Sequence, residues 1–133
     1  MERAIHRVAY RCQTRGWHSL RQEDLGGLWE HLVLDELRAH FQPGEIHYWR
    51  DKQRHELDFV FARKGHPPVA IECKWKLKAG DPGNFRIFKT HYPDARLIMI
   101  ATDGTSPRQN RKNGTIEAGA GHLQAAVELA LGN

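Results

Sequence analysis

Two acidic residues and a lysine in the middle of the chain have the types and spacing of a divalent-metal site. Asp58 lies in one run of alternating apolar residues, and Glu72 and Lys74 lie two positions apart in the next such run. Alternate residues of a strand share a face. If the two runs pair as a hairpin, Asp58 can therefore meet Glu72. Two carboxylates and a lysine then converge at one edge of a sheet.

This convergence is unfavourable without a cation, because nearby carboxylates repel one another and burial raises their pKa values. A hard divalent cation relieves the repulsion, since it prefers oxygen ligands and tolerates remaining waters. We therefore expect Asp58, Glu72 and the backbone carbonyl of Cys73 to hold Mg²⁺ or Mn²⁺. We expect Lys74 to orient or deprotonate the attacking water, or to stabilise charge on a phosphate.

A third acid, Glu30, comes from a predicted helix. Its helical stripe otherwise holds three apolar residues: Leu34, Leu37 and Phe41. A carboxylate on a core-facing stripe is explained if it contacts the metal directly or through water. The catalytic candidates are therefore Glu30, Asp58, Glu72 and Lys74, with Glu56 as a secondary candidate.

The same residues have a simpler interpretation. A Glu and a Lys two positions apart on a strand commonly form a solvated pair, so the spacing of Glu72 and Lys74 alone is a weak signal. The combination of an acid on a helix, an acid on one strand and acid-x-lysine on the next strand is more specific. That combination favours one shared site over unrelated surface charges.

Hydrophobic periodicity predicts the elements that position these residues. We expect helices over about residues 2–13, 19–41, 81–92 and 122–131, and strands over about residues 46–52, 56–63, 69–75 and 96–101. In the second strand, Leu57, Phe59 and Phe61 are expected on one face, with Asp58 and Val60 on the other. Residues 102–119 are rich in glycine and proline and are expected to form a long exposed loop. The order predicts an α/β fold with an αβββαβ core and a mixed sheet flanked by helices.

Length and charge fit a single domain with an anionic partner. The chain has 133 residues, a formal net charge of +4 and a pI near 9.3. We expect one domain over residues 1–133, with a basic helical extension at 1–23 and a core over about 24–131. The extension carries an arginine ridge: Arg3, Arg7, Arg11 and Arg15. The nucleic-acid-binding candidates near the acids are Arg50, Lys52, Arg54, Lys76 and Lys78.

Several classes of protein are disfavoured. No apolar run has the length that spans a bilayer, and the first residues lack a secretory signal, so we expect a cytoplasmic protein without a membrane partner. Two cysteines cannot build a disulfide framework, and the nine histidines show no zinc-ligand spacing. No phosphate-binding loop motif occurs, so we do not expect ATP to bind or to be hydrolysed.

Four blocks carry a resemblance to a known family: LGGLWEHLVLDEL at 25–37, IHYWRDK at 46–52, ELDFV at 56–60 and AIECKW at 70–75. They resemble the C-terminal domain of unknown function that follows an AAA+ ATPase module in many prokaryotic predicted ATPases. That domain is assigned to the PD-(D/E)XK, or restriction-endonuclease-like, superfamily. The resemblance covers about residues 25–100. One departure is Leu57, which stands where the superfamily motif has proline.

The resemblance implies a restriction-endonuclease-like fold and a role for single residues. Glu30 matches the helix acid, Asp58 the metal-binding aspartate, Glu72 the second acid and Lys74 the lysine. Glu56 matches an acid common beside the aspartate. The function expected from the site residues together with this resemblance is Mg²⁺- or Mn²⁺-dependent hydrolysis of DNA, and the resemblance supports the fold and the site more than the cleavage. The alternatives are a DNA-binding or protein-interaction module without turnover, and a regulatory domain derived from an ATPase. A homodimer is an open arrangement, since no interface is specified.

Overall fold

The fold of the chain is a mixed α/β arrangement. The structure is a computed structural model, and it describes residues 22–77, 83–111 and 114–132. In chain order the elements are α2 (Gln22–His40), η2 (Pro43–Glu45), β1 (Ile46–Arg50), β2 (Glu56–Phe61), β3 (Val69–Lys74), α3 (Gly83–His91), β4 (Arg96–Ala101), β5 (Arg108–Gln109), β6 (Ile116–Ala118), η4 (Ala120–His122) and α4 (Leu123–Ala130). The predicted helix at 2–13, its arginine ridge and Lys78 lie outside the described residues.

The strands form one six-stranded mixed sheet in the order β1-β2-β3-β4-β6-β5. The pairs β1–β2, β2–β3 and β5–β6 are antiparallel, and β3–β4 and β4–β6 are parallel. The α3 helix connects β3 to β4, as a crossover between parallel neighbours requires. The expected α/β class, with a mixed sheet flanked by helices, is confirmed.

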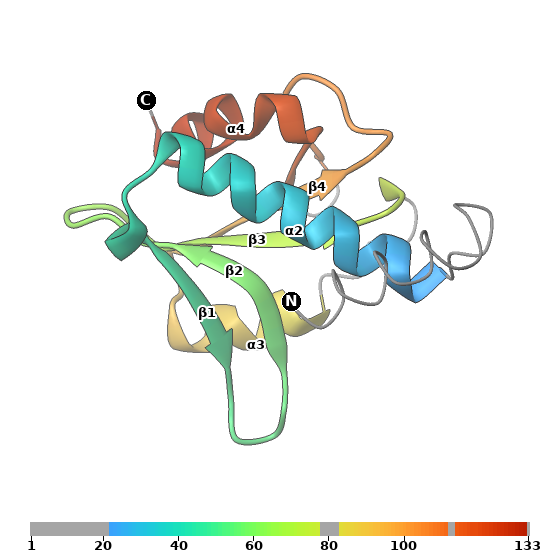
Figure 1. Cartoon of the computed structure of the whole chain (residues 1–133). Helices are drawn as coiled ribbons and strands as arrows, with labels where there is room; N and C mark the ends of the chain where they lie inside the picture. The colour runs from blue at the N-terminus through green and yellow to red at the C-terminus, as the bar shows by residue number, and fades with distance from the viewer. Residues whose placement is uncertain (1–21, 78–82, 112–113, 133) are drawn as a thin grey trace.

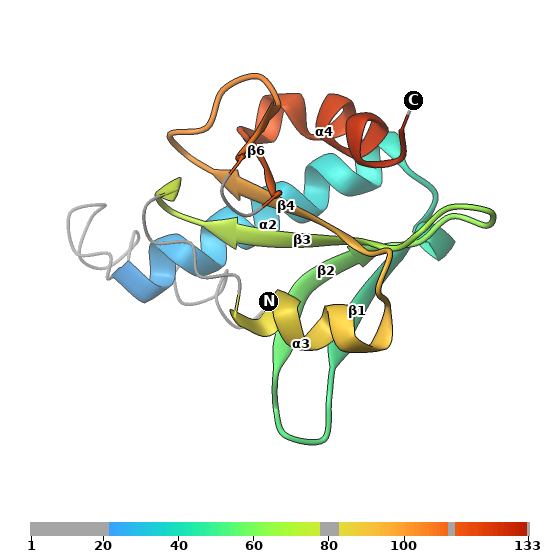
Figure 2. The same ribbon diagram turned by 180° about the vertical axis from the view of Figure 1, so that it is seen from behind.

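Helices cover both faces of the sheet, so the domain has three layers. Helix α2 lies in front of the sheet with α4 beside it, whereas α3 lies behind (Figure 1). The opposite view brings α3 to the front (Figure 2). One apolar cluster joins α2 and α4 to the sheet through residues such as Leu37, Phe59 and Val127. A second cluster lies under α3 and includes Leu57, Val60 and Phe88.

The prediction of an exposed loop over residues 102–119 is wrong in part. Its second half forms β6, which pairs in parallel with β4. Thr115, Ile116 and Ala118 are at most 2% exposed. The strand is only three residues long, and its pairing partner precedes it by more than a dozen residues. Local periodicity cannot reveal so short a strand, because the neighbouring glycines and prolines dominate the pattern.

The predicted alternation of β2 is also wrong at one place. His47 pairs with Val60, and Trp49 pairs with Leu57. One β1 residue, Tyr48, therefore faces two β2 residues, which is the pattern of a β-bulge. Leu57 consequently packs with Val60 under α3, although regular alternation would place it with Phe59 against α2. The extra residue turns Asp58 to the α2 side of the sheet together with Phe59.

The Trp29 side chain ties α2 to the centre of the sheet. Its indole Nε1 donates a hydrogen bond to the Ile100 carbonyl at 3.1 Å. Trp29→Phe should lower the free energy of unfolding by about 1–2 kcal/mol, because the hydrogen bond and part of the buried ring are lost. Leu32→Ala, on the same helix but 46% exposed, should change the free energy by less than about 0.5 kcal/mol. Urea unfolding measures both free energies. Equal effects of the two substitutions would contradict the claim that Trp29 stabilises the packing of α2 on the sheet.

Candidate acid cluster

The acid cluster forms where the ladder between β2 and β3 ends. The last paired residues toward the site are Phe59 and Ile71. Beyond this pair, the Cys73 N–H donates a hydrogen bond to Asp58 Oδ2 at 2.7 Å. The Asp58 backbone also acts on the Glu72 carboxyl and opposes the rise in pKa that burial causes there. Where the backbone ladder ends, a side chain thus accepts the Cys73 N–H, and the Asp58 and Glu72 carboxyls lie close enough to affect each other's charge.

Glu30 reaches the same place from α2. Its carboxyl shares a hydrogen bond with Asp58, which lies on the α2 side because of the bulge. Burial, together with the hydrogen bond to Asp58 and the negative charge of Asp58, raises the pKa of Glu30 to about 8. At neutral pH the Glu30 carboxyl therefore keeps its proton and donates it toward Asp58. The expected joining of Glu30 to Asp58 is present in the structure.

Glu72 is the most buried acid of the cluster, at 7% exposure. Burial and the negative charge of Asp58 raise its pKa, Lys74 opposes the rise, and the resulting pKa is about 7. Lys74 Nζ lies 3.6 Å from Glu72 Oε2, and its side chain is 31% exposed. The pair is therefore neither a free surface pair nor a fully buried one. Lys74 can reach solvent while its ammonium stays beside the acids.

The Cys73 thiol is a poor ligand and a poor nucleophile here. Burial raises its pKa well above the usual value, and the charges of Asp58 and Glu30 act in the same direction. The thiolate is the form that binds metals and attacks electrophiles, so this thiol stays inert. It packs at the edge of the apolar cluster between α2 and the sheet. Only the backbone of Cys73 can serve a site.

A shallow pocket of about 270 Å³ opens beside the cluster. Its lining comes from α2, β1 and β2: Glu30, Tyr48, Trp49, Arg50, Glu56, Leu57 and Asp58. Glu72 and Lys74 do not line it, and they join this group through Asp58. A larger cavity, of about 860 Å³, is lined by residues 65–68, by residues between Lys89 and Arg96, and by Gly114. None of the clustered acids borders that cavity, so chemistry points to the smaller pocket.

The secondary candidate Glu56 lies at the rim of the same pocket. Its side chain is 60% exposed and forms an ion pair with Arg50, with 3.3 Å between Oε1 and Nε. The guanidinium of Arg50 thus balances the negative charge of Glu56. Asp58, two residues further along β2, makes the contacts with Glu30 and Cys73. Glu56 therefore contributes to the pocket wall and holds Arg50 there.

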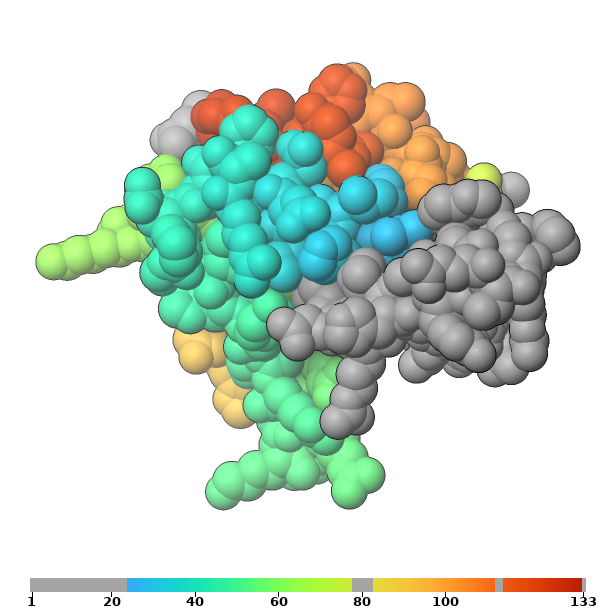
Figure 3. Space-filling view, viewed as in Figure 1, coloured from blue at the N-terminus to red at the C-terminus, as the bar shows by residue number. Residues whose placement is uncertain are grey.

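Three of the predicted basic residues, Arg50, Lys52 and Arg54, lie on the β1–β2 hairpin. This hairpin projects from the body of the domain (Figure 3). An internal pair orders its tip, because His55 Nδ1 lies 2.7 Å from Asp51 Oδ2. Lys52 and Arg54 are exposed at the tip, Arg50 lies at its base, and Lys76 is exposed beyond β3. The arm therefore presents one cation, Arg50, in the lining of the acid pocket and two more at its tip.

The donor set suits a magnesium-type ion in chemistry, although it is small. Among residues 22–77, 83–111 and 114–132, no three His, Cys, Asp or Glu side chains are grouped to hold a metal ion. The predicted set has two carboxylates, Asp58 and Glu72, and one backbone carbonyl. Mg²⁺ is often held by one or two carboxylates, with water and substrate phosphate as the other ligands. The hard oxygen donors present therefore fit this ion and no softer one.

One feature of the site lies beyond sequence reasoning, and a second is the exposure of an aromatic residue that the sequence offers for base stacking. The bulge that turns Asp58 toward Glu30 has no local signature, because Glu56–Phe61 alternates in sequence. The second feature is Tyr48, which is 63% exposed beside the acids. Exposure distinguishes Tyr48 from its neighbour Trp49. Trp49 packs on Phe88 at 5.2 Å and belongs to the core side, whereas Tyr48 does not.

The fold and the acid cluster together define the class: a mixed α/β domain with coupled carboxylates at the end of a central strand pair. The chain belongs to the family described as Domain of unknown function (DUF4143), whose model matches residues 25–118. All three clustered acids and Lys74 lie within this match. The family membership agrees with the resemblance to a domain of unknown function, and it leaves the activity open.

Two curated relatives share part of this domain. They are the uncharacterized proteins Mb2031c of Mycobacterium bovis and Rv2008c of Mycobacterium tuberculosis, each 40% identical over 81 residues. The match covers 61% of this chain and 18% of each relative, so the chain spans under a fifth of their length. No solved structure matches the chain. Among the described residues, no helix has the length and hydrophobicity to cross a bilayer.

Proposed function

We propose that this domain is a metal-dependent nuclease of the PD-(D/E)XK type that hydrolyses phosphodiester bonds in DNA. The observation that carries the proposal is the coupling of Glu30, Asp58, Glu72 and Lys74 where the β2–β3 ladder ends. These residues come from the helix and the two strands that the superfamily motif uses, in the same order. Carboxyls whose pKa values are raised by burial and by a neighbouring acid are frequent in active sites, and both Glu30 and Glu72 have this environment.

Each residue has a role that its contacts support. Asp58, Glu72 and the Cys73 carbonyl would hold Mg²⁺ or Mn²⁺, an ion that activates water and neutralises developing charge on the phosphate. The Cys73 N–H fixes Oδ2 of Asp58, and the Glu30 carboxyl shares a further hydrogen bond with the same side chain. Lys74 would orient the attacking water. Glu30 would act through Asp58, whose charge it adjusts with its proton.

The direct test is a cleavage assay on single-stranded, duplex and branched DNA. We expect products with Mg²⁺ or Mn²⁺ and none with EDTA. The whole chain should be used, because the described residues omit the segment with the arginine ridge. If no DNA form is cut with either metal, the nuclease proposal is wrong.

Replacing Asp58 by asparagine should weaken Mn²⁺ binding at least about tenfold. The amide still accepts the Cys73 N–H, so the fold is retained, but one anionic ligand is lost. Isothermal calorimetry at pH 8 measures the affinity. Glu45→Gln, at an acid of η2 paired with Arg63, is the matched control and should bind Mn²⁺ as the unmodified chain does. Equal affinity of Asp58→Asn and the control would contradict the role of Asp58.

A second candidate function is DNA binding without turnover. It is favoured by the small donor set among the described residues, where three metal-ligating side chains do not come together. In this case the exposed cations of the β1–β2 arm would bind phosphate, and salt would weaken the complex. The much greater length of the relatives also fits a domain that serves a larger protein, such as one with an AAA+ module. Calorimetry with Mn²⁺ separates this candidate from the nuclease.

A further inference from the structure

Tyr48 is an exposed aromatic side chain with a rigid support. It is 63% exposed, the highest value among the large hydrophobic side chains of the described residues. Its ring lies against Phe59, with 5.7 Å between centroids and 51° between planes. Phe59 is fully buried, so the contact fixes the tyrosine ring from below. A flat aromatic surface is therefore held in place and open to solvent.

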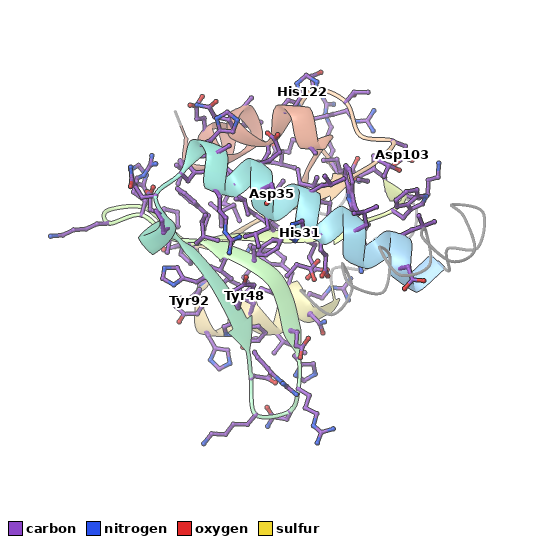
Figure 4. All side chains as sticks on the ribbon, viewed as in Figure 1. His31, Asp35, Tyr48, Tyr92, Asp103 and His122 are labelled. Atoms are coloured by element: carbon purple, nitrogen blue, oxygen red, sulfur yellow. The ribbon has the colours of Figure 1, made fainter. Side chains whose placement is uncertain are left out.

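The position of Tyr48 follows from the same bulge that turns Asp58. At the bulge, Tyr48 is the single β1 residue that faces two β2 residues, Asp58 and Phe59. It lines the pocket with Glu30, Asp58 and Arg50. The labelled side chains show Tyr48 on the hairpin side of the sheet, below α2 (Figure 4). Strand β1 is at the edge of the sheet that the described residues form.

The pocket thus combines three recognition elements for a nucleotide. Arg50 supplies a cation that can bind phosphate, and Tyr48 supplies a surface on which a base can stack. The carboxylates lie where the phosphodiester bond would be cut. Stacking on an aromatic ring is how sequence-tolerant proteins bind single strands. Inside a duplex each base is already stacked on its neighbours, so this ring can only engage a base that is unpaired.

We propose that Tyr48 is a base-stacking subsite beside the acid cluster, and that the preferred substrate is DNA with an unpaired nucleotide next to the phosphate that is cut. Single strands, overhangs and flaps meet this requirement, and blunt duplex does not. The inference rests on the proposed nuclease function and names its substrate class. It uses Tyr48 for positioning and assigns it no bond-making step.

The test measures binding in EDTA, so it does not depend on cleavage. Fluorescence anisotropy is recorded with a single-stranded oligonucleotide and with a blunt duplex. Tyr48→Ala should weaken single-strand binding about tenfold and change duplex binding little. Tyr48→Phe should bind as the unmodified chain does, because it keeps the ring. Quenching of a 2-aminopurine base by the unmodified chain, and its loss in Tyr48→Ala, reports the stack itself.

Tyr92→Ala is the matched control. Tyr92 is also an exposed tyrosine on an aromatic support, with its ring 4.8 Å from that of Phe88, but it does not line the pocket with Glu30 and Asp58. It should leave single-strand affinity unchanged. The stacking subsite is wrong if Tyr48→Ala weakens both DNA forms equally, or if Tyr48→Ala and Tyr92→Ala have the same effect. Metal-dependent cutting of single-stranded DNA by Tyr48→Ala at the unmodified rate, with DNA below saturation, would also overturn it and leave the nuclease intact.

Discussion

Replacing Lys74 by alanine is expected to lower the rate of metal-dependent DNA cleavage by about 10²–10⁴-fold, the range for loss of a positioned proton-transfer group. The ammonium lies 3.6 Å from Glu72 and keeps 31% of its side chain exposed, so it can face both the acids and an attacking water. A group that acts on the water should affect kcat more than KM. Single-turnover cleavage and DNA affinity, measured separately, give the two effects.

The control for this prediction is Lys64→Ala. Lys64 is an exposed lysine in the turn between β2 and β3, at the opposite end of these strands from the acids. The same charge is removed there, so a loss caused by net charge alone would appear in both variants. If the Lys74→Ala protein cuts DNA at the unmodified rate, Lys74 has no role in the cleavage step. A loss confined to KM would assign Lys74 to phosphate binding.

The composition of the site is visible in the sequence, and its geometry is not. Asp58, Glu72 and Lys74 are found by strand periodicity, and Glu30 is found because a carboxylate interrupts an apolar stripe. The bulge in β2 depends on how many residues of β1 face it, which is a property of two segments together. Sequence alternation therefore places Leu57 on the wrong face and cannot show that Asp58 turns toward α2.

The same reason explains what sequence reasoning finds and misses in the fold. Strand β4 is recognised because its core, Leu97–Ala101, is apolar and buried on both faces. Strand β6 is missed because three residues in a glycine-rich segment carry too little pattern. Its strand identity comes from β4, whose free edge it fills. Short elements whose stability is supplied by a distant partner are the ones a local pattern cannot show.

Without metal, the protein is expected to lose stability as the pH rises, and Glu72→Gln should remove much of this loss. The pKa of Glu72 is raised from 4.5 to about 7 by burial. Between these values the folded chain binds a proton that the unfolded chain has released, so the free energy of unfolding falls with pH. The loss is complete above pH 7 and amounts to about 3 kcal/mol. Glu30, with a pKa of about 8, extends the fall to higher pH.

The glutamine variant has no charge to bury, so it should match the unmodified chain near pH 4 and exceed it by about 2–3 kcal/mol at pH 8 in EDTA. Urea unfolding at several pH values gives both curves. Adding Mg²⁺ or Mn²⁺ should then reverse the order, because the ion stabilises only the chain that keeps both carboxylates, by an amount set by its concentration over the dissociation constant. Parallel curves, with no crossing upon addition of metal, would show that Glu72 is a buried structural acid and that the cluster holds no ion.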